Sequence, residues 1–313
     1  MILRKLGFFK KRNSVSFSPA SLQGLIAPLI TPMNSDKSID SFSLKTITAR
    51  LMNKGVMNFF VLNQFSEYAS LSSEQKKELM GIVSSEISGK GILIAGCFGS
   101  DTEEVVQNVL DAQRFTNICA VNVPAMCMER ELEFIDFFDS IFTRTTANIL
   151  LYNNPVMSKK SVPPLWLDNI INWERLVGVI DYSRNPDYLD ELGKYYQLTK
   201  LFEENEELAF DALRRGFSGL SCISTMTFVS YYLSLIEDFS ELDYARVMRM
   251  EAKVSGLNKL IPHNKKVQVV KHILATQGLI QPYYSDSLEP LTQKEMQLIE
   301  NAFRLRPAVA TNQ

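Results

Sequence analysis

Short apolar runs alternate with amphipathic segments along most of the 313-residue chain. The runs are rich in Leu, Ile, Val and Phe and are too short to be helices, which indicates buried strands. We expect strands at residues 25–31, 57–63, 91–97, 118–124, 148–154, 176–181, 198–204 and 220–224. Each one is followed by polar or turn-forming residues.

The segments between these runs carry helix signals. Residues 70–87 begin with Ser72 or Ser73 as a cap, and residues 100–115 begin with a Ser-Asp-Thr cluster followed by acids. Strands that alternate with helices pair in parallel, so the pattern predicts an α/β fold, a (β/α)8 TIM barrel. An open doubly wound sheet is the alternative. Its nucleotide-binding form lacks support, because no glycine-rich phosphate motif follows the first strand.

The two ends of the chain differ from the barrel pattern. After Ser240 the strand signal stops, and three helical segments are expected at 244–261, 265–280 and 292–305. Residues 1–21 contain five basic residues and no acid. We expect a disordered basic tail there, with an organelle transit peptide or a membrane-surface anchor as alternatives. The predicted division is therefore an extension at 1–21, a barrel at 22–239 and a helical region at 240–313.

Charge and composition restrict the function further. A net charge of −2 with 22% charged residues argues against a nucleic-acid surface. No apolar run approaches the ~20 residues of a membrane span. The four cysteines show no CxxC spacing, which predicts a reduced cytoplasmic compartment with buried thiols, although the basic leader leaves organelle targeting open. With only two histidines, we expect no metal site, and no cofactor motif is present.

In a TIM barrel, functional residues lie at the carboxyl ends of the strands. Tyr152 ends an apolar strand and precedes a proline turn, so its hydroxyl is expected to point into the barrel mouth. A phenol there can relay protons, or it can serve as a packed tyrosine with one structural hydrogen bond. Cys97 also lies at a strand end. No histidine accompanies it in the strand-end loops, and we expect a core thiol.

Several segments share their order and spacing with one known family. They are APLITPMNSDKSID at 27–40, VLNQFSEYASLSSEQ at 61–75, IAGCFGSDTEE at 94–104, LLYNNP at 150–155, LVGVIDYS at 176–183, GFSGLSCIS at 216–224 and VKHILATQGLI at 270–280. Over about Gly24 to Phe303, the chain resembles the dihydrodipicolinate synthase and N-acetylneuraminate lyase family of barrel aldolases. The resemblance implies an imine mechanism, in which a sixth-strand lysine attacks the ketone of a 2-oxo acid such as pyruvate.

The resemblance also implies further site residues. A tyrosine on the fifth strand relays protons, and a Gly-Thr-Thr-Gly-Glu loop after the second strand holds the substrate carboxylate. A tyrosine pair follows the fourth strand, and in the synthases an arginine follows the fifth. Family members are usually dimers of dimers.

This chain departs from that pattern at most of these positions. The lysine position falls on Ile180, inside a frame that is otherwise kept from Gly178 to Ser183. The loop after the second strand keeps only Glu67, and Phe65 is expected to fill the space of the substrate carboxylate. The remaining differences are Ala125 and Met126 at the tyrosine pair and Met157 at the arginine, whereas Tyr152 is retained.

We therefore expect a non-catalytic relative that acts as a regulatory or partner protein. It is expected to form a homo-oligomer (dimer or tetramer) or to assemble with an active paralogue. One alternative is an enzyme with lysine-independent chemistry at Tyr152 and Gln64. Another is a binding protein with a re-lined apolar pocket for a small 2-oxo acid or other small ligand. The candidate ligand-binding residues are Gln64, Phe65, Ser66, Met126, Met157 and Ile223. We expect Lys159, Lys160 and Lys200 to be surface charges, not a relocated imine lysine.

Overall fold

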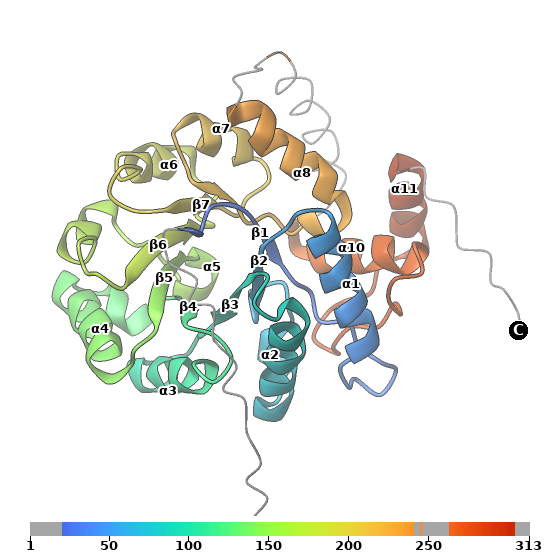
Figure 1. The fold of residues 1–313 in the computed structure, drawn as a ribbon, viewed down its shortest axis with the longest axis horizontal. Helices are drawn as coiled ribbons and strands as arrows, with labels where there is room; N and C mark the ends of the chain where they lie inside the picture. The colour runs from blue at the N-terminus through green and yellow to red at the C-terminus, as the bar shows by residue number, and fades with distance from the viewer. Residues whose placement is uncertain (1–20, 241–244, 246–262, 304–313) are drawn as a thin grey trace, which may run out of the picture.

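The computed structural model of the protein describes residues 21–240, 245 and 263–303. Its parallel strands close into a barrel in sequence order, β1 to β8, which confirms the predicted TIM barrel and excludes the open sheet (Figure 1). The strands are β1 Gly24–Pro28, β2 Asn58–Val61, β3 Ile92–Gly96, β4 Ile118–Val121, β5 Asn148–Asn153, β6 Leu176–Asp181, β7 Leu201–Glu203 and β8 Gly219–Leu220.

Helices surround the barrel. They are α1 Ser41–Asn53, α2 Ser73–Ile87, α3 Thr102–Ala112, α4 Glu131–Arg144, α5 Pro155–Ser158, α6 Pro186–Gly193, α7 Ala209–Arg214 and α8 Thr225–Ser240, with short 3₁₀ turns η2 Tyr68–Ser70, η3 Ala125–Met128, η4 Pro164–Asn169 and η5 His263–Lys265. Sequence capping signals explain several helix starts. Ser72 and Gln75 form a reciprocal capping box at α2. Asp101 accepts a hydrogen bond from the Glu104 amide at α3.

The core has two layers, because successive strand residues point to opposite faces. Val179 of β6 and Leu201 of β7 point outward and pack in the large layer between barrel and helices. Ile180 and Phe202 point inward and pack in a separate cluster inside the barrel. The interior is therefore filled with side chains and is not a channel.

Barrel closure depends on a glycine at the last strand. A Cβ atom at Gly219 would lie 1.8 Å from the carbonyl oxygen of Gly24, so β8 reaches β1 only because position 219 has no side chain.

The C-terminal region contributes α10 Lys266–Thr276 and α11 Gln293–Phe303. These helices confirm two of the three predicted helical segments and lie beyond α1 and α8 in Figure 1. The helix expected at 244–261 and the basic extension expected at 1–21 lie almost wholly outside the described residues. The domain limits at 21/22 and 239/240 stay a prediction. Within the described parts of the chain, no helix is both long enough and apolar enough to cross a membrane.

Candidate functional site

Tyr152 lies in the inward-facing layer at the mouth of the barrel. It pairs in register with Ile180 on β6, which in turn pairs with Phe202 on β7. The Tyr152 side chain is fully buried, with its ring stacked on Phe98 at 5.3 Å and edge-to-face with Phe60 at 5.7 Å between centroids. These aromatic contacts fix the direction of the hydroxyl group.

The Tyr152 hydroxyl belongs to a buried polar network. It donates a short hydrogen bond to Oε2 of Glu204, which also accepts from Nε2 of Gln64 at 2.8 Å. Asn154 Nδ2 donates to Oε1 of Gln64 at 2.9 Å and to the Tyr152 hydroxyl at 3.2 Å. Glu204 reaches the network because it follows Phe202 by two residues, so strand alternation turns both side chains inward.

Burial controls the charge of this network. Burial raises the pKa of the Glu204 carboxyl to about 8, although the hydrogen bonds from Tyr152 and Gln64 oppose the shift. Burial also raises the pKa of Tyr152 well above its usual range, and the neighbouring Glu204 adds to this. Tyr152 is therefore a neutral phenol, and Glu204 is largely protonated at pH 7. This acid–phenol pair can hold or pass a proton.

A second carboxylate near the mouth is paired. Glu206 Oε2 lies 2.5 Å from Lys266 Nζ, and Glu206 Oε1 accepts a 3.0 Å hydrogen bond from the Ser224 hydroxyl. Burial alone would lower the pKa of Lys266, but Glu206 and Tyr182 outweigh burial and raise it. Lys266 is therefore an ammonium ion committed to Glu206.

A third acid braces the loop after β2. Glu67 has a left-handed backbone with φ 57°, and its Oε1 lies 2.5 Å from Lys271 Nζ. Its Oε2 accepts a hydrogen bond from the Ser285 amide at 2.6 Å. Burial lowers the pKa of Lys271, and Glu67 opposes that shift. Glu67 therefore ties the loop after β2 to the C-terminal region.

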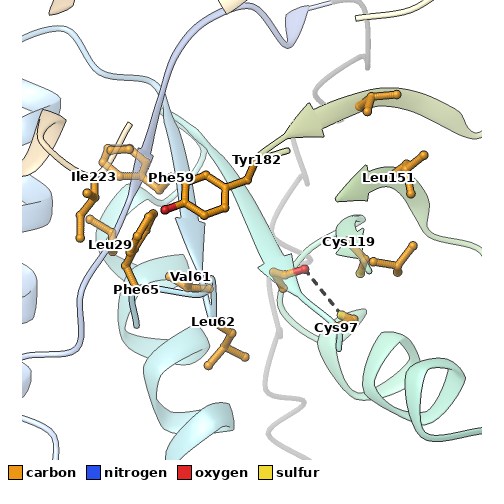
Figure 2. Close-up of a cluster of buried hydrophobic side chains, with 14 of the residues drawn as sticks. Leu29, Phe59, Val61, Leu62, Phe65, Cys97, Cys119, Leu151, Tyr182 and Ile223 are labelled. Atoms are coloured by element: carbon orange, nitrogen blue, oxygen red, sulfur yellow. Dashed lines mark hydrogen bonds between the residues drawn. The ribbon is translucent and has the colours of Figure 1, made fainter. Parts of the chain in front are cut away.

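The structure places the candidate residues of the β2 loop in different surroundings. Gln64 is part of the buried network, whereas Phe65 belongs to the large apolar cluster and packs edge-to-face with Tyr182, with 6.0 Å between the ring centroids. Ile223 belongs to the same cluster, and Figure 2 shows it near Phe65 and Leu29. The Ser66 hydroxyl donates to the carbonyl oxygen of Asn63, and the Ser66 carbonyl accepts from Thr31. Ser66 therefore holds the loop in shape.

The two methionine candidates are separated. Met157 is half-buried and packs against the interior cluster that contains Ile180. Met126 lies on η3 with 61% of its surface exposed. The structure thus brings Tyr152, Ile180, Gln64 and Met157 together, and it leaves Met126 on the surface.

None of the three lysines considered from the sequence points into this network. Lys160 pairs with Glu129, and Lys159 is the left-handed C-cap of α5. Lys200 was expected inside the seventh strand, but β7 begins at Leu201, so Lys200 precedes it at the opposite end of the barrel. The strand starts late because residues 195–199 form turn hydrogen bonds, such as that from Thr199 N to Tyr195 O.

The thiol of Cys97 is buried and faces backbone oxygens. Its Sγ lies 3.6 Å from the carbonyl oxygens of Ala95 and Asn108, and Figure 2 shows the first of these contacts. Burial raises the pKa of Cys97 well above its usual value, so the thiol does not ionise near neutral pH. In the described part of the chain, no three His, Cys, Asp or Glu side chains are grouped to hold a metal ion.

Fold and site together define the class: a TIM barrel with functional groups at the carboxyl ends of its strands. The chain matches the model of the Dihydrodipicolinate synthetase family over residues 21–304 and belongs to this family.

The relatives support the same assignment. An uncharacterised DapA-like lyase of Pyrococcus furiosus is 24% identical over 76% of this chain and 81% of the relative. A 4-hydroxy-tetrahydrodipicolinate synthase of Ehrlichia canis is 22% identical over 92% of this chain and 98% of the relative. Among solved structures, dihydrodipicolinate synthase from Bacteroides thetaiotaomicron has a TM-score of 0.85 at 22% identity, covering 91% of this chain and 98% of that one.

Sequence reasoning missed Glu204, Glu206, Lys266 and Asn154. One signal for Glu204 was present in the sequence. The seventh predicted strand ends on two adjacent acids, Glu203 and Glu204, and strand alternation turns one of the two inward. Lys266 carried no such signal, because its partner Glu206 lies 60 residues away in the chain.

Proposed function

We propose that this protein is a family member that does not form an imine with 2-oxo acids and that serves as a non-catalytic regulatory or partner protein. The observation that carries the proposal is Ile180. Its side chain is fully buried in the inward layer, between Tyr152 and Phe202, where the family resemblance places the reactive lysine. Without an amine at this strand end there is no nucleophile for the ketone.

The lysines around the mouth support the proposal. Lys266 and Lys271 lie 2.5 Å from Glu206 and Glu67, respectively. An amine must be neutral to attack a carbonyl carbon, and a buried ion pair keeps Lys266 protonated. The tyrosine of the resembled mechanism is retained, but its hydroxyl is hydrogen-bonded to Glu204.

Exposed apolar side chains support the partner role. Met126, Leu132, Val156 and Leu165 are 61%, 62%, 64% and 73% exposed. They belong to η3, α4, α5 and η4, which contact one another on one side of the barrel. Exposed apolar side chains on neighbouring elements are typical of an association surface.

Borohydride trapping tests the loss of imine chemistry. The protein is incubated with pyruvate and reduced, and its intact mass is measured beside an active dihydrodipicolinate synthase as positive control. We expect an adduct on the control and none on this chain. A stoichiometric adduct here contradicts the proposal, and peptide mapping would then identify the lysine that replaces position 180.

Sedimentation of charged variants tests the association surface. Leu165→Glu is expected to shift an oligomer toward monomer, because it buries a carboxylate in the interface. Leu198→Glu is the matched control, since Leu198 is 60% exposed but lies before β7, at the other end of the barrel. If the two variants have the same oligomeric state, this support for a partner role is lost.

A second candidate function is proton-transfer catalysis without a lysine. The acid–phenol pair of Glu204 and Tyr152 favours it, because a carboxyl with a pKa of about 8 can exchange a proton near neutral pH. Solvent deuterium incorporation into a panel of 2-oxo acids, followed by NMR, tests this function. Exchange that disappears in Tyr152→Phe would support it, and an absence of exchange would leave the non-catalytic role.

A further inference from the structure

Among the residues that the structure describes, several buried polar atoms have no hydrogen-bond partner, and two of these lie at neighbouring inward positions of the barrel mouth. They are Oε1 of Glu204 and the hydroxyl oxygen of Ser221, and both side chains are 0% exposed. Buried polar groups are nearly always paired, and each unpaired group costs about 1–3 kcal/mol. These two atoms therefore indicate a partner that the described part of the chain does not provide.

The two atoms belong to neighbouring positions on the inward face. Glu203 pairs in register with Leu220, and the Ser221 amide donates to the Glu203 carbonyl at 2.7 Å, so Glu204 and Ser221 follow at the next level. Leu220 and Cys222 both pack in the outer layer. Ser221 between them faces inward, toward the same side as Glu204.

The surroundings favour a small occupant. Ile180 and Phe202 form the apolar layer below, and Tyr152, Asn154 and Ser221 are all buried. Gln64 is the half-buried member of the network and donates to the other carboxyl oxygen of Glu204. An occupant of more than a few atoms would have to displace these side chains.

The charges around the site favour a cation. The titratable groups around the site are Glu204, Glu206, Lys266, Tyr152 and Tyr182. Asp181 and Glu203 are register partners on β6 and β7, and their side chains face outward. Lys266 is committed to Glu206 at 2.5 Å. An ionised Glu204 therefore has no counter-ion of its own, and a carboxylate ligand would meet a second negative charge.

We propose that the mouth of the barrel binds a small primary ammonium ion, which donates hydrogen bonds to Glu204 Oε1 and the Ser221 hydroxyl. An ammonium group provides three donors, and charge-assisted hydrogen bonds are roughly twice as strong as neutral ones. The ion also supplies the positive charge that the resembled family carries on its lysine side chain. The ligand class is thus opposite in charge to a 2-oxo acid.

Binding is coupled to proton release. Because burial raises the pKa of Glu204 to about 8, the carboxyl must lose its proton before it can pair with a cation. The apparent affinity should rise about tenfold per pH unit between pH 6 and pH 8 and level off above that. A neutral ligand would show no such dependence.

The ammonium site rests on the proposed function in one respect, because both require that position 180 carries no amine. The two proposals fail separately. A trapped pyruvate adduct would contradict the loss of imine chemistry and leave amine binding to be measured on its own. An absence of amine binding would leave the trapping result unchanged.

The test is calorimetric titration of the full chain with methylammonium chloride, with sodium chloride at equal ionic strength and sodium acetate as controls. Glu204→Gln removes the carboxylate at nearly constant volume and should weaken binding by tenfold or more. Glu203→Gln is the matched control, because it makes the same change one residue earlier on the outward face; binding should stay within about twofold. Ser221→Ala should weaken binding by about three- to tenfold.

Saturable binding of methylammonium with proton release, abolished in Glu204→Gln, supports the proposal. Heats equal to those of sodium chloride, as for a site filled by water, overturn it. Tighter binding of acetate, or equal binding to Glu204→Gln, also overturns it. If Glu204→Gln does not fold by circular dichroism, the Ser221→Ala variant and the proton count of the wild-type protein decide the outcome.

Discussion

The hydroxyl of Tyr152 and Oε2 of Glu204 are hydrogen-bonded across the barrel mouth, which joins the end of β5 to the end of β7. Both side chains are fully buried, so neither can exchange this partner for water. The phenol donor stabilises the ionised carboxylate of Glu204 more than its neutral carboxyl form.

Tyr152→Phe should therefore destabilise the protein by about 1–3 kcal/mol, and more at pH 9 than at pH 6. At pH 9, Glu204 is ionised and loses its strongest donor, whereas at pH 6 it is neutral. Urea unfolding at both pH values measures the difference. Tyr188→Phe is the control, because the Tyr188 hydroxyl donates to the neutral carbonyl of Val162. A Tyr152→Phe loss that is the same at both pH values would contradict the charge argument.

Glu204→Gln should change how stability varies with pH. The folded pKa of Glu204 is about 8, and its ordinary value is 4.5, so the folded state holds the extra proton between these values. Stability from this group is then full below about pH 4.5 and is lost as pH rises toward 8. Relative to the wild type, the free energy of unfolding of the variant should rise by up to about 1.4 kcal/mol per pH unit in that window. Above the window the difference should stay constant.

Unfolding free energies at pH 5 to 9 check this. Asp181, whose pKa burial raises to about 6, titrates in both proteins and cancels in the difference. Parallel curves for variant and wild type would show that Glu204 is not a buried acid with a raised pKa.

Ile180→Lys should not restore imine formation. The new amine would lie in the same inward layer as Glu204 and pair with its carboxylate, which keeps the amine protonated and unreactive. We expect no borohydride-trapped pyruvate adduct and a loss of methylammonium binding, because the lysine supplies the cation internally. Ile180→Met is the control of similar length and should retain amine binding. An adduct on Ile180→Lys would show that Glu204 does not control the charge at this position.

Lys271→Met should destabilise the protein by about 3–5 kcal/mol, because it leaves Glu67 buried without its counter-ion. The double variant Lys271→Met/Glu67→Gln should recover part of this loss, since no charge then remains buried. Denaturant unfolding of the single and double variants measures the coupling. Lys160→Met removes an exposed ion pair with Glu129 and should have little effect. If the losses in unfolding free energy from the Glu67 and Lys271 substitutions simply add in the double variant, the pairing is contradicted.

The fold followed from the sequence because strand burial has a local signature. Every predicted strand run overlaps a strand of the barrel, and the run at 176–181 matches β6 at both ends. The run at 220–224 fits less well, since β8 ends at Leu220. Cys222 and Ile223 beyond that point are also buried in the large apolar cluster, so apolar character alone predicts a longer strand than the structure has.

The site was only partly predictable. The position of Tyr152 follows from its strand, and its burial agrees with an inward hydroxyl. Its partner Glu204 lies 52 residues away, and only the closure of β5 and β7 around β6 brings the two together. Phe65, expected to fill the substrate-carboxylate space, packs edge-to-face with Tyr182, and its role stays a prediction.

Helix α10 carries both Lys266 and Lys271, the counter-ions of Glu206 and Glu67. Both carboxylates therefore have counter-ions only when this helix, which follows the barrel in the chain, is packed against the barrel. A fragment that ends at residue 239 would contain every strand and yet retain two buried carboxylates without partners. Helix α10 thus neutralises buried charges of the barrel. Separating α10 from the barrel should unfold the loop after β2 before it unfolds the strands.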